Sequence, residues 1–354
     1  MRKFLIALAL LLGVVFIIVR FAEMHDILSV LARGKIAPIL AALILQILWI
    51  WVVGSTYSAL YRLLGIPSRS FYMARVAAAA TFISVVAPAG GLGSVAVFIS
   101  NAHSRGYSTA RAAVASVLFL WLEYGAALVM LTFGLSEMAH RNNLHWSEIT
   151  ASLILLAGAL VLAILLYLGM VSADLLGKVL RRAAGVVNWC LRPFIRRDYL
   201  STARASSFAL ELAEGIAALR LNPRGLLRPA LLALLNKVTL ASILGCTFLA
   251  FDIPLDIGVL IAAFSIAYLF LIVSPTPAGL GVVEGVMTVT LRSLGVPIET
   301  AAVITLAYRG ITFWFPLLLG MIALRSLPHP KPEPAVPAVE ITPAAEPADH
   351  ANLS

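Results

Sequence analysis

The chain contains little of the material from which metal sites, disulfide frameworks and soluble surfaces are built. Its 354 residues include two cysteines, Cys190 and Cys246, which are far apart and have no CxxC neighbour. Neither a disulfide framework nor a cysteine metal site is therefore expected. Charged residues make up only 12% of the chain, against about 25% in soluble domains. Together with 61% hydrophobic residues, this composition indicates a protein that is surrounded by lipid over most of its surface.

Acidic residues are scarcer than basic ones, with 17 Asp and Glu against 26 Lys and Arg and a formal net charge of +9. A basic protein can bind nucleic acid, but here the cations lie in loops between apolar segments, as the positive-inside rule describes. The segment 279–285 imitates GxGxxG, but its last glycine is one place late and no strand–turn–helix context surrounds it. No HExxH or GxSxG motif occurs. We expect no nucleic-acid partner, no metal, no cofactor and no enzymatic activity.

One hydrophobic segment is interrupted at Leu271–Gly285, LIVSPTPAGLGVVEG. Pro275 and Pro277 lack a backbone N–H and disfavour a continuing helix, and Gly279 and Gly281 permit a sharp reversal. Broken backbone at membrane depth is tolerated only inside protein or against a wet cavity. The segment therefore predicts the tip of a re-entrant helical hairpin.

The same pattern occurs 188 positions earlier, in the segment VVAPAGGLGS at 85–94. Interrupted hydrophobic segments at matching places in two halves indicate a transporter-type binding site. The residues predicted to bind substrate at the two breaks are Pro88, Gly90, Gly91, Gly93, Ser94, Pro275, Pro277, Gly279, Gly281 and Glu284. The new helices after Gly93 and Gly281 would present their N-termini to an anionic group such as phosphate, and Ser94 would add a hydroxyl donor. Alternatively, Glu284 only complements the helix dipole.

The predicted fold is an all-α polytopic membrane protein with six full spans and two re-entrant hairpins. The spans are Phe4–Val19, Ile36–Leu60, Ala112–Leu135, Ile149–Met170, Leu226–Phe251 and Thr300–Leu324, and the hairpins are Phe71–Ser104 and Ile257–Arg292. The first span resembles a signal peptide, but no small-x-small cleavage site follows it, so we expect it to be retained.

The predicted spans form two repeats, 4–135 and 149–324, each in the order span, span, hairpin, span. Three crossings per repeat place the second repeat in the opposite orientation, so the repeats are inverted and one hairpin enters from each face. Both termini are then cytoplasmic. The transmembrane domain would cover 1–325, with a basic cytoplasmic insert at 172–225 that is either a membrane-surface helix or an ordinary connector. The proline-rich tail, 326–354, is expected to be disordered.

Four charged residues fall within hydrophobic segments: Glu123, Lys237, Glu284 and Arg309. A charge at the bilayer centre costs roughly 2.5–3.5 kcal/mol on insertion scales, so such residues face the protein interior and pair with one another. Glu123 and Arg309 lie at nearly equivalent places in the two repeats. We predict that they form one pair and that Lys237 and Glu284 form the other. These pairs either take part in function or only fix helix register.

The motif P-x-P-x-G-L-G-x-x-E-G at 275–285, the related P-A-G-G-L-G at 88–93, and the residues Tyr308-Arg309 and Leu122-Glu123 resemble the flippase-like family. This family is also called the lysylphosphatidylglycerol synthase transmembrane region. The resemblance implies a multi-span bacterial inner-membrane protein that moves a lipid between leaflets. It also implies that aminoacylation is not expected, because the soluble aminoacyltransferase domain of the full-length synthases is absent here.

Two functions from different classes follow from this reading. The favoured one is translocation of a phospholipid, aminoacyl-phospholipid or other polar lipid, with membrane lipids as partners and the head group held at the hairpin tips. The alternative is an accessory protein that presents lipid to a separate lipid-modifying enzyme without transporting it. The sequence indicates neither the lipid nor the oligomeric state.

Overall fold

The structure is a computed structural model that describes residues 27, 29–86, 92–171, 178, 182, 223–274 and 276–326. These residues form helices and their connections, with no strand among them. The elements are α2 (Ile36–Leu63), α3 (Ser70–Val86), α4 (Leu92–Ser104), α5 (Thr109–His140), α6 (Trp146–Val171), η1 (Pro223–Leu226), α9 (Leu227–Ala250), α10 (Ile257–Val273), η2 (Pro277–Gly279), α11 (Val282–Ser293), α12 (Ile298–Arg309), η3 (Gly310–Trp314) and α13 (Phe315–Ser326).

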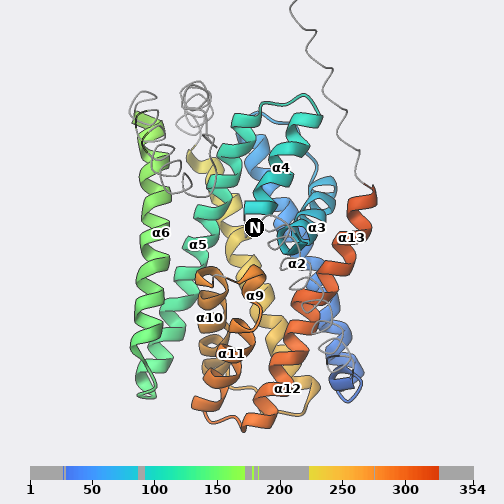
Figure 1. Cartoon of the computed structure of the whole chain (residues 1–354), viewed down its shortest axis with the longest axis vertical. Helices are drawn as coiled ribbons and strands as arrows, with labels where there is room; N and C mark the ends of the chain where they lie inside the picture. Colours follow the sequence, from blue (N-terminus) through green and yellow to red (C-terminus); the bar gives the residue numbers. More distant parts are fainter. Residues whose placement is uncertain are drawn as a thin grey trace, which may run out of the picture.

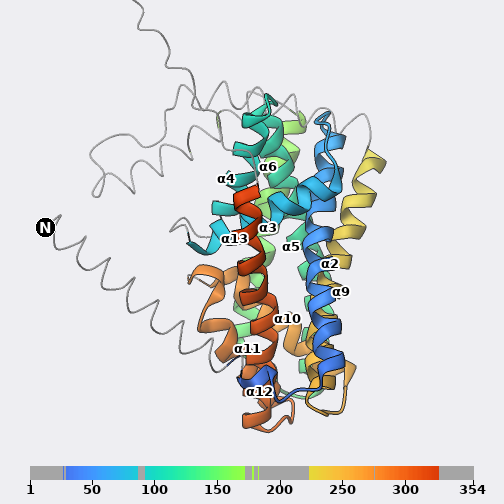
Figure 2. The same ribbon diagram turned by 90° about the vertical axis from the view of Figure 1, so that its right-hand side faces the viewer.

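The bundle combines long helices with two pairs of short ones. Helices α2, α5, α6 and α9 run along the long axis, and α12, η3 and α13 together form another long element (Figures 1 and 2). The pair α3–α4 lies in one half of the bundle and the pair α10–α11 lies in the other half (Figures 1 and 2). Within the described ranges, five helical segments are long and apolar enough to cross a membrane. Their outer surfaces carry exposed Leu, Ile and Val side chains, as a lipid-facing surface does.

The expectation of an all-helical membrane protein with several spans is confirmed. Five of the six predicted spans coincide with these helices to within five residues at every end. The sixth, Phe4–Val19, lies outside the described residues. So do the tail beyond residue 326 and nearly all of the insert 172–225, and the domain boundaries stay predictions.

The two predicted breaks both separate helices that pack against each other. Helix α10 ends at Val273 and α11 begins at Val282, while α3 ends at Val86 and α4 begins at Leu92. Helix α3 also contacts η2, so part of the first pair lies against the break of the second pair. That the pairs are re-entrant in a membrane, and that the two halves are inverted repeats, stay predictions.

Helix α3 is rich in alanine because it packs closely between α2 and α13. A Cβ atom added to Gly54 of α2 would collide with the backbone of Ala74, and one added to Gly320 of α13 would collide with the carbonyl oxygen of Ala78. The alanines from Ala77 to Ala80 are all buried. Small side chains thus let the backbones approach closely, as is common between membrane helices.

Charge is distributed unevenly along the bundle. Within the described part of the chain, the end formed by the start of α3 and the end of α4 carries arginines and no carboxylate. These arginines are Arg62, Arg69, Arg75, Arg105, Arg111, Arg224, Arg228 and Arg325. The opposite end is mixed. There Asp256 caps α10 by accepting hydrogen bonds from the backbone N–H groups of Gly258 and Val259, and a bond of 2.9 Å from Arg141 lowers the pKa of Asp256 below its usual 3.8.

The close approach of α13 to α3 leads to a stability prediction. Gly320→Ala should destabilise the protein by about 1–3 kcal/mol, because the added methyl group meets backbone that cannot move away alone. Gly125→Ala, in the middle of α5 with no atom within 4 Å of the added Cβ, is the matched control. It should leave stability unchanged or raise it by up to about 1 kcal/mol. Thermal unfolding of both variants in detergent measures the difference, and equal melting temperatures would contradict the packing.

Candidate functional site

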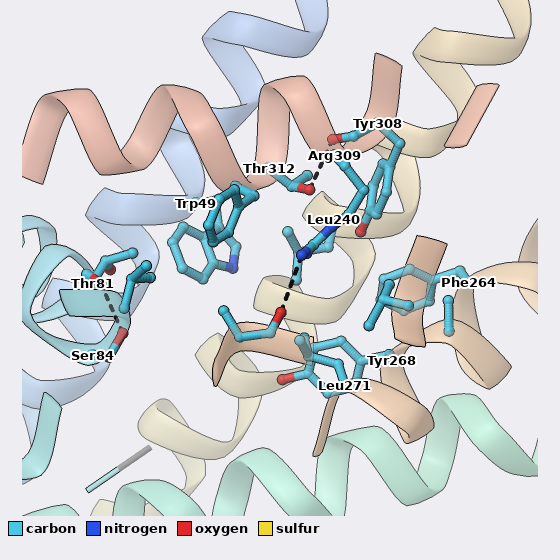
Figure 3. Close-up of a pocket in the computed structure, with 15 residues that line it drawn as sticks. Trp49, Thr81, Ser84, Leu240, Phe264, Tyr268, Leu271, Tyr308, Arg309 and Thr312 are labelled. Atoms are coloured by element: carbon cyan, nitrogen blue, oxygen red, sulfur yellow. Dashed lines mark hydrogen bonds between the residues drawn. The ribbon is translucent and has the colours of Figure 1, made fainter. Parts of the chain in front are cut away.

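A cavity of about 170 Å³ lies where the two short helix pairs meet the long helices (Figure 3). Its wall includes residues of α2, α3, α9, α10, η2, α11, α12 and η3, so both halves of the chain contribute to it. Most of the lining is apolar. The polar and aromatic side chains in the wall are Trp49, Thr81, Ser84, Tyr268, Tyr308, Arg309 and Thr312.

The break between α10 and α11 forms one wall of the cavity. Its backbone is left-handed at Ala278 (φ 52°), Gly279 (φ 67°) and Gly281 (φ 79°). A side chain at Gly279 would be strained and would also lie 2.5 Å from Val283 and 2.9 Å from Leu271, so glycine is required there. Ala278 has a Cβ and adopts this region at a cost of about 1–3 kcal/mol. In this strained turn the Ala278 carbonyl accepts a hydrogen bond from a side chain in place of a helical one.

Arg309 occupies that position. Its side chain extends from the end of α12 across the pocket towards the break (Figure 3). Its Nη2 donates to the Ala278 carbonyl at 3.1 Å, and its Nε donates to Glu284 Oε1 at 2.6 Å. The Arg309 side chain is 6% exposed and that of Glu284 is 16% exposed. The other oxygen of Glu284, Oε2, is buried and has no hydrogen-bond partner among the described residues.

The helix that carries Arg309 is irregular at this point. Gly310–Trp314 forms a π-helical turn directly after Arg309, and Pro316 follows two residues later. Wider turns of this kind are frequent at functional sites, and a proline removes one helical hydrogen bond. Phe313 from this turn lines the cavity, with its ring 5.0 Å from the guanidinium carbon of Arg309. The irregular turn therefore places a cation and an aromatic ring at the same wall.

A second buried ion pair joins α5, α9 and α10. Lys237 is fully buried and donates from Nζ to Glu123 Oε2, to the Tyr268 hydroxyl at 2.6 Å and to Asn236 Oδ1 at 3.5 Å. The Tyr268 hydroxyl in turn donates to Glu123 Oε2 at 3.4 Å. Three partners around one ammonium group are what a charge in an apolar interior needs.

The second pair is connected to the cavity through aromatic side chains. Tyr268 lines the cavity and contacts Lys237, and the Trp49 indole N–H, also in the wall, donates to Asn236 Oδ1 at 3.0 Å. Lys237 and Glu123 themselves do not line it. Arg309 is accordingly the one charged side chain in the wall among the residues that the structure describes.

The predicted pairing of these charges is wrong. The structure pairs Glu123 with Lys237 and Glu284 with Arg309, in place of Glu123 with Arg309 and Lys237 with Glu284. The reason is local: α11 and α12 are joined by a short turn and pack against each other. Glu284 near the start of α11 therefore faces Arg309 at the end of α12, so the pair closes within one half of the chain.

The predicted binding residues are only partly brought together. Gly279 and Gly281 form the break, Pro277 begins η2, and Glu284 lies in the first turn of α11. Gly93 and Ser94 lie in the first turn of α4, and neither these two residues nor Gly279, Gly281 and Glu284 line the cavity wall. Pro88, Gly90, Gly91 and Pro275 lie outside the described residues. That any of these residues binds substrate stays a prediction.

Several residues of the site were not predicted from the sequence. Tyr268, Asn236 and Ala278 were missed, although the first two interrupt hydrophobic segments as the four charges do. Trp49 was expected within a span but not as part of a site. Ala278 gave no signal, because its role depends on its backbone carbonyl and not on its side chain.

The fold and the cavity define a class: a helical multi-span membrane protein with a broken-helix site that contains buried ion pairs. The family model described as the lysylphosphatidylglycerol synthase TM region matches residues 4–320. The chain therefore belongs to the lysylphosphatidylglycerol synthase TM region family, as its motifs suggested, and is a membrane protein related to lipid handling. No curated protein matches the sequence.

The observed pairing predicts a pattern of mutational coupling. Glu123→Gln alone should destabilise the protein by about 3–5 kcal/mol, because it leaves the Lys237 charge buried without a counter-charge. Adding Lys237→Met should recover much of that loss, since no unpaired charge then remains. The control is Glu123→Gln with Arg309→Met, whose effects should add. Thermal unfolding of the single and double variants measures both couplings, and recovery in the control but not in the first pair would contradict the pairing.

Proposed function

We propose that this protein moves a phospholipid, aminoacyl-phospholipid or other polar lipid between the leaflets of a bacterial inner membrane, without covalent chemistry. The observation that carries the proposal is the cavity between the two broken helix pairs, with a buried arginine in a mostly apolar wall. Broken helices next to a polar site inside a membrane bundle are the usual construction of a transporter binding site. Membership of a lipid-handling family supports the same function.

The size of the cavity supports transport of a head group and not of a whole lipid. A volume of about 170 Å³ is below the 300–1,000 Å³ of sites that enclose drug-sized ligands. It holds about five or six water molecules at roughly 30 Å³ each. We propose that the phosphate and the adjoining part of a head group occupy this space while the acyl chains stay in the bilayer, which avoids exposing them to water.

The proposal includes the topology. The two helix pairs lie in opposite halves of the bundle (Figures 1 and 2) and are proposed as re-entrant hairpins of two inverted repeats. The arginine-rich end is proposed to be cytoplasmic, in accordance with the positive-inside rule, with both termini on that side. Movement of the two repeats about the cavity would open it to each leaflet in turn.

Cysteine labelling tests this topology. Ser104→Cys, at the end of α4, and Arg292→Cys, near the end of α11, both lie at exposed positions. In cells expressing each variant without its native cysteines, an impermeant maleimide should label Arg292→Cys from outside and Ser104→Cys only after permeabilisation. Labelling of both from the same side would refute the inverted arrangement.

A leaflet-exchange assay tests the function. Purified full-length protein in liposomes should accelerate exchange of a fluorescent phospholipid between leaflets, measured as the fraction that dithionite reduces. Glu284→Gln should slow this exchange at least about tenfold, since loss of a buried charged contact costs over 1.4 kcal/mol. Glu299→Gln, the same change at an exposed position in the first turn of α12, is the matched control and should exchange lipid at the wild-type rate.

The accessory role is the other outcome of the same assay. No exchange of any phospholipid tested, by protein that binds lipid and is folded, would refute transport and favour a protein that presents lipid to a separate enzyme. Exchange that Glu284→Gln leaves unchanged would show that lipid moves elsewhere on the protein. In that case the cavity would not be the site.

A further inference from the structure

We infer that the cavity binds the anionic phosphodiester group of a lipid on Arg309, and that Glu284 takes up one proton as this anion replaces it as the counter-charge of the guanidinium. The inference deepens the proposed function and rests on it for the source of the ligand, a membrane lipid. It assigns Arg309 as the ligand-binding residue and Glu284 as an internal competitor for the same site.

Among the described residues, the partners of the Arg309 guanidinium use only two of its N–H donors. Of its five N–H groups, the one on Nε is bonded to Glu284 and one on Nη2 is bonded to the Ala278 carbonyl. No hydrogen bond of Nη1 to a described residue is present. A planar guanidinium with free N–H groups matches phosphate oxygens, and it is the side chain best suited to bidentate binding of phosphodiesters. The Tyr308 side chain lies in the same wall, whereas the Thr312 hydroxyl already donates to the Tyr308 backbone carbonyl at 2.8 Å.

Charge balance requires Glu284 to change state when an anion binds. In the structure the guanidinium and the carboxylate neutralise each other beside an apolar cavity. An added anion would leave a net negative charge in surroundings that solvate it poorly, which is costly. If Glu284 takes a proton from water, it becomes a neutral acid, and the guanidinium is neutralised by the anion. Both states of the site then carry no net charge.

Among the described residues packed around Glu284 there is no other carboxylate, so Glu284 is the group that takes up the proton. Helix α11 packs against α10 and α12, and the titratable side chains that these two helices present in or beside the cavity are Tyr268, Tyr308 and Arg309. The other buried carboxylate, Glu123, is paired with Lys237 away from the cavity wall. Oε2 of Glu284 is buried without a partner among the described residues. Its protonation would remove the negative charge that now neutralises Arg309 and leave the guanidinium to the bound anion.

Isothermal titration calorimetry on the full chain in neutral detergent tests the inference. The probes are dihexanoyl-phosphatidylglycerol, which carries one negative charge, and dihexanoyl-phosphatidylcholine, which carries no net charge. Titration in two buffers of different ionisation enthalpy should show uptake of about one proton per bound phosphatidylglycerol at neutral pH. The affinity should weaken by up to about tenfold for each unit of rising pH, because the proton is a co-ligand of the anion. Phosphatidylcholine should bind more weakly and take up no proton.

Substitutions of Glu284 and Arg309 should have opposite effects on the binding of phosphatidylglycerol. Glu284→Gln imitates the protonated acid, so it should bind phosphatidylglycerol about tenfold tighter or more at neutral pH, without proton uptake. It should still exchange lipid slowly, because release needs the carboxylate to return to Arg309. Arg309→Gln should lose the preference for the anionic lipid. Glu299→Gln, the same change at an exposed position in the first turn of α12, is the matched control and should keep wild-type affinity and proton uptake.

The possible outcomes separate this inference from the proposed function. Anion binding by the wild-type protein without proton uptake, or equal affinity for the two lipids, would overturn it, and neither result depends on a variant folding. Glycerophosphoglycerol, the head group without acyl chains, tests whether the ligand is a membrane lipid or a soluble phosphodiester. Binding of the lipid alone supports a membrane lipid, and equal binding of the free head group would refute it. Proton-coupled binding without leaflet exchange would refute transport alone, and leaflet exchange without anion preference would refute this inference alone.

Discussion

A guanidinium buried in an apolar bundle needs partners at its own depth, and the structure around the cavity follows from that requirement. Arg309 finds a carboxylate in the first turn of α11 and a backbone carbonyl at Ala278. That carbonyl is available only because α10 ends at Val273, since inside a continuous helix it would bond to an N–H group four residues later. The carbonyl that the break exposes therefore accepts a hydrogen bond from the arginine, which itself needs an acceptor at this depth. The helix ends provide polar backbone groups that lipid could not solvate, and Arg309 provides donors for them.

The second ion pair constrains the bundle differently, because it connects helices from both halves of the chain. Glu123 belongs to α5, while Lys237 and Tyr268 belong to α9 and α10. Separation of such a buried pair would leave two charges without partners, at a cost of several kcal/mol. Any movement of one half against the other must therefore keep α5 and α9 together at this level. The Arg309–Glu284 pair lies within one half and does not restrict that movement.

The sequence was informative wherever a residue type acts through its own chemistry. Pro277, Gly279 and Gly281 predicted the break, because proline and glycine act on the local backbone whatever surrounds them. The four intramembrane charges were recognised because each is costly in lipid. Their pairing was predicted wrongly, because equivalent positions in the two proposed repeats suggest a different pairing from the one that chain connectivity imposes. Glu284 and Arg309 lie twelve residues before and thirteen residues after Val296, in the turn between two helices that pack together, so they had to meet.

The rest of the site could not have been predicted because it depends on packing between distant segments. The π-helical turn at Gly310–Trp314 has no composition that separates it from an ordinary membrane helix. Trp49 and Tyr268 become part of the cavity only when α2 and α10 lie beside the break, and a single sequence does not specify that placement. Ala278 contributes a carbonyl, which every residue has. Its role follows from a left-handed conformation that alanine does not predict.

The two helix pairs share a pattern of proline and glycine but differ in what they contribute to the cavity. From the first pair, α3 contributes Thr81, Ser84 and Val85, and both hydroxyls donate to backbone carbonyls of their own helix. From the second pair and the helix that follows come the arginine and its carboxylate. Within the described residues, the duplicated backbone break is thus not accompanied by a duplicated charge. Among the described residues the cavity wall is therefore asymmetric, because its charged side chain, Arg309, comes from the second half of the chain.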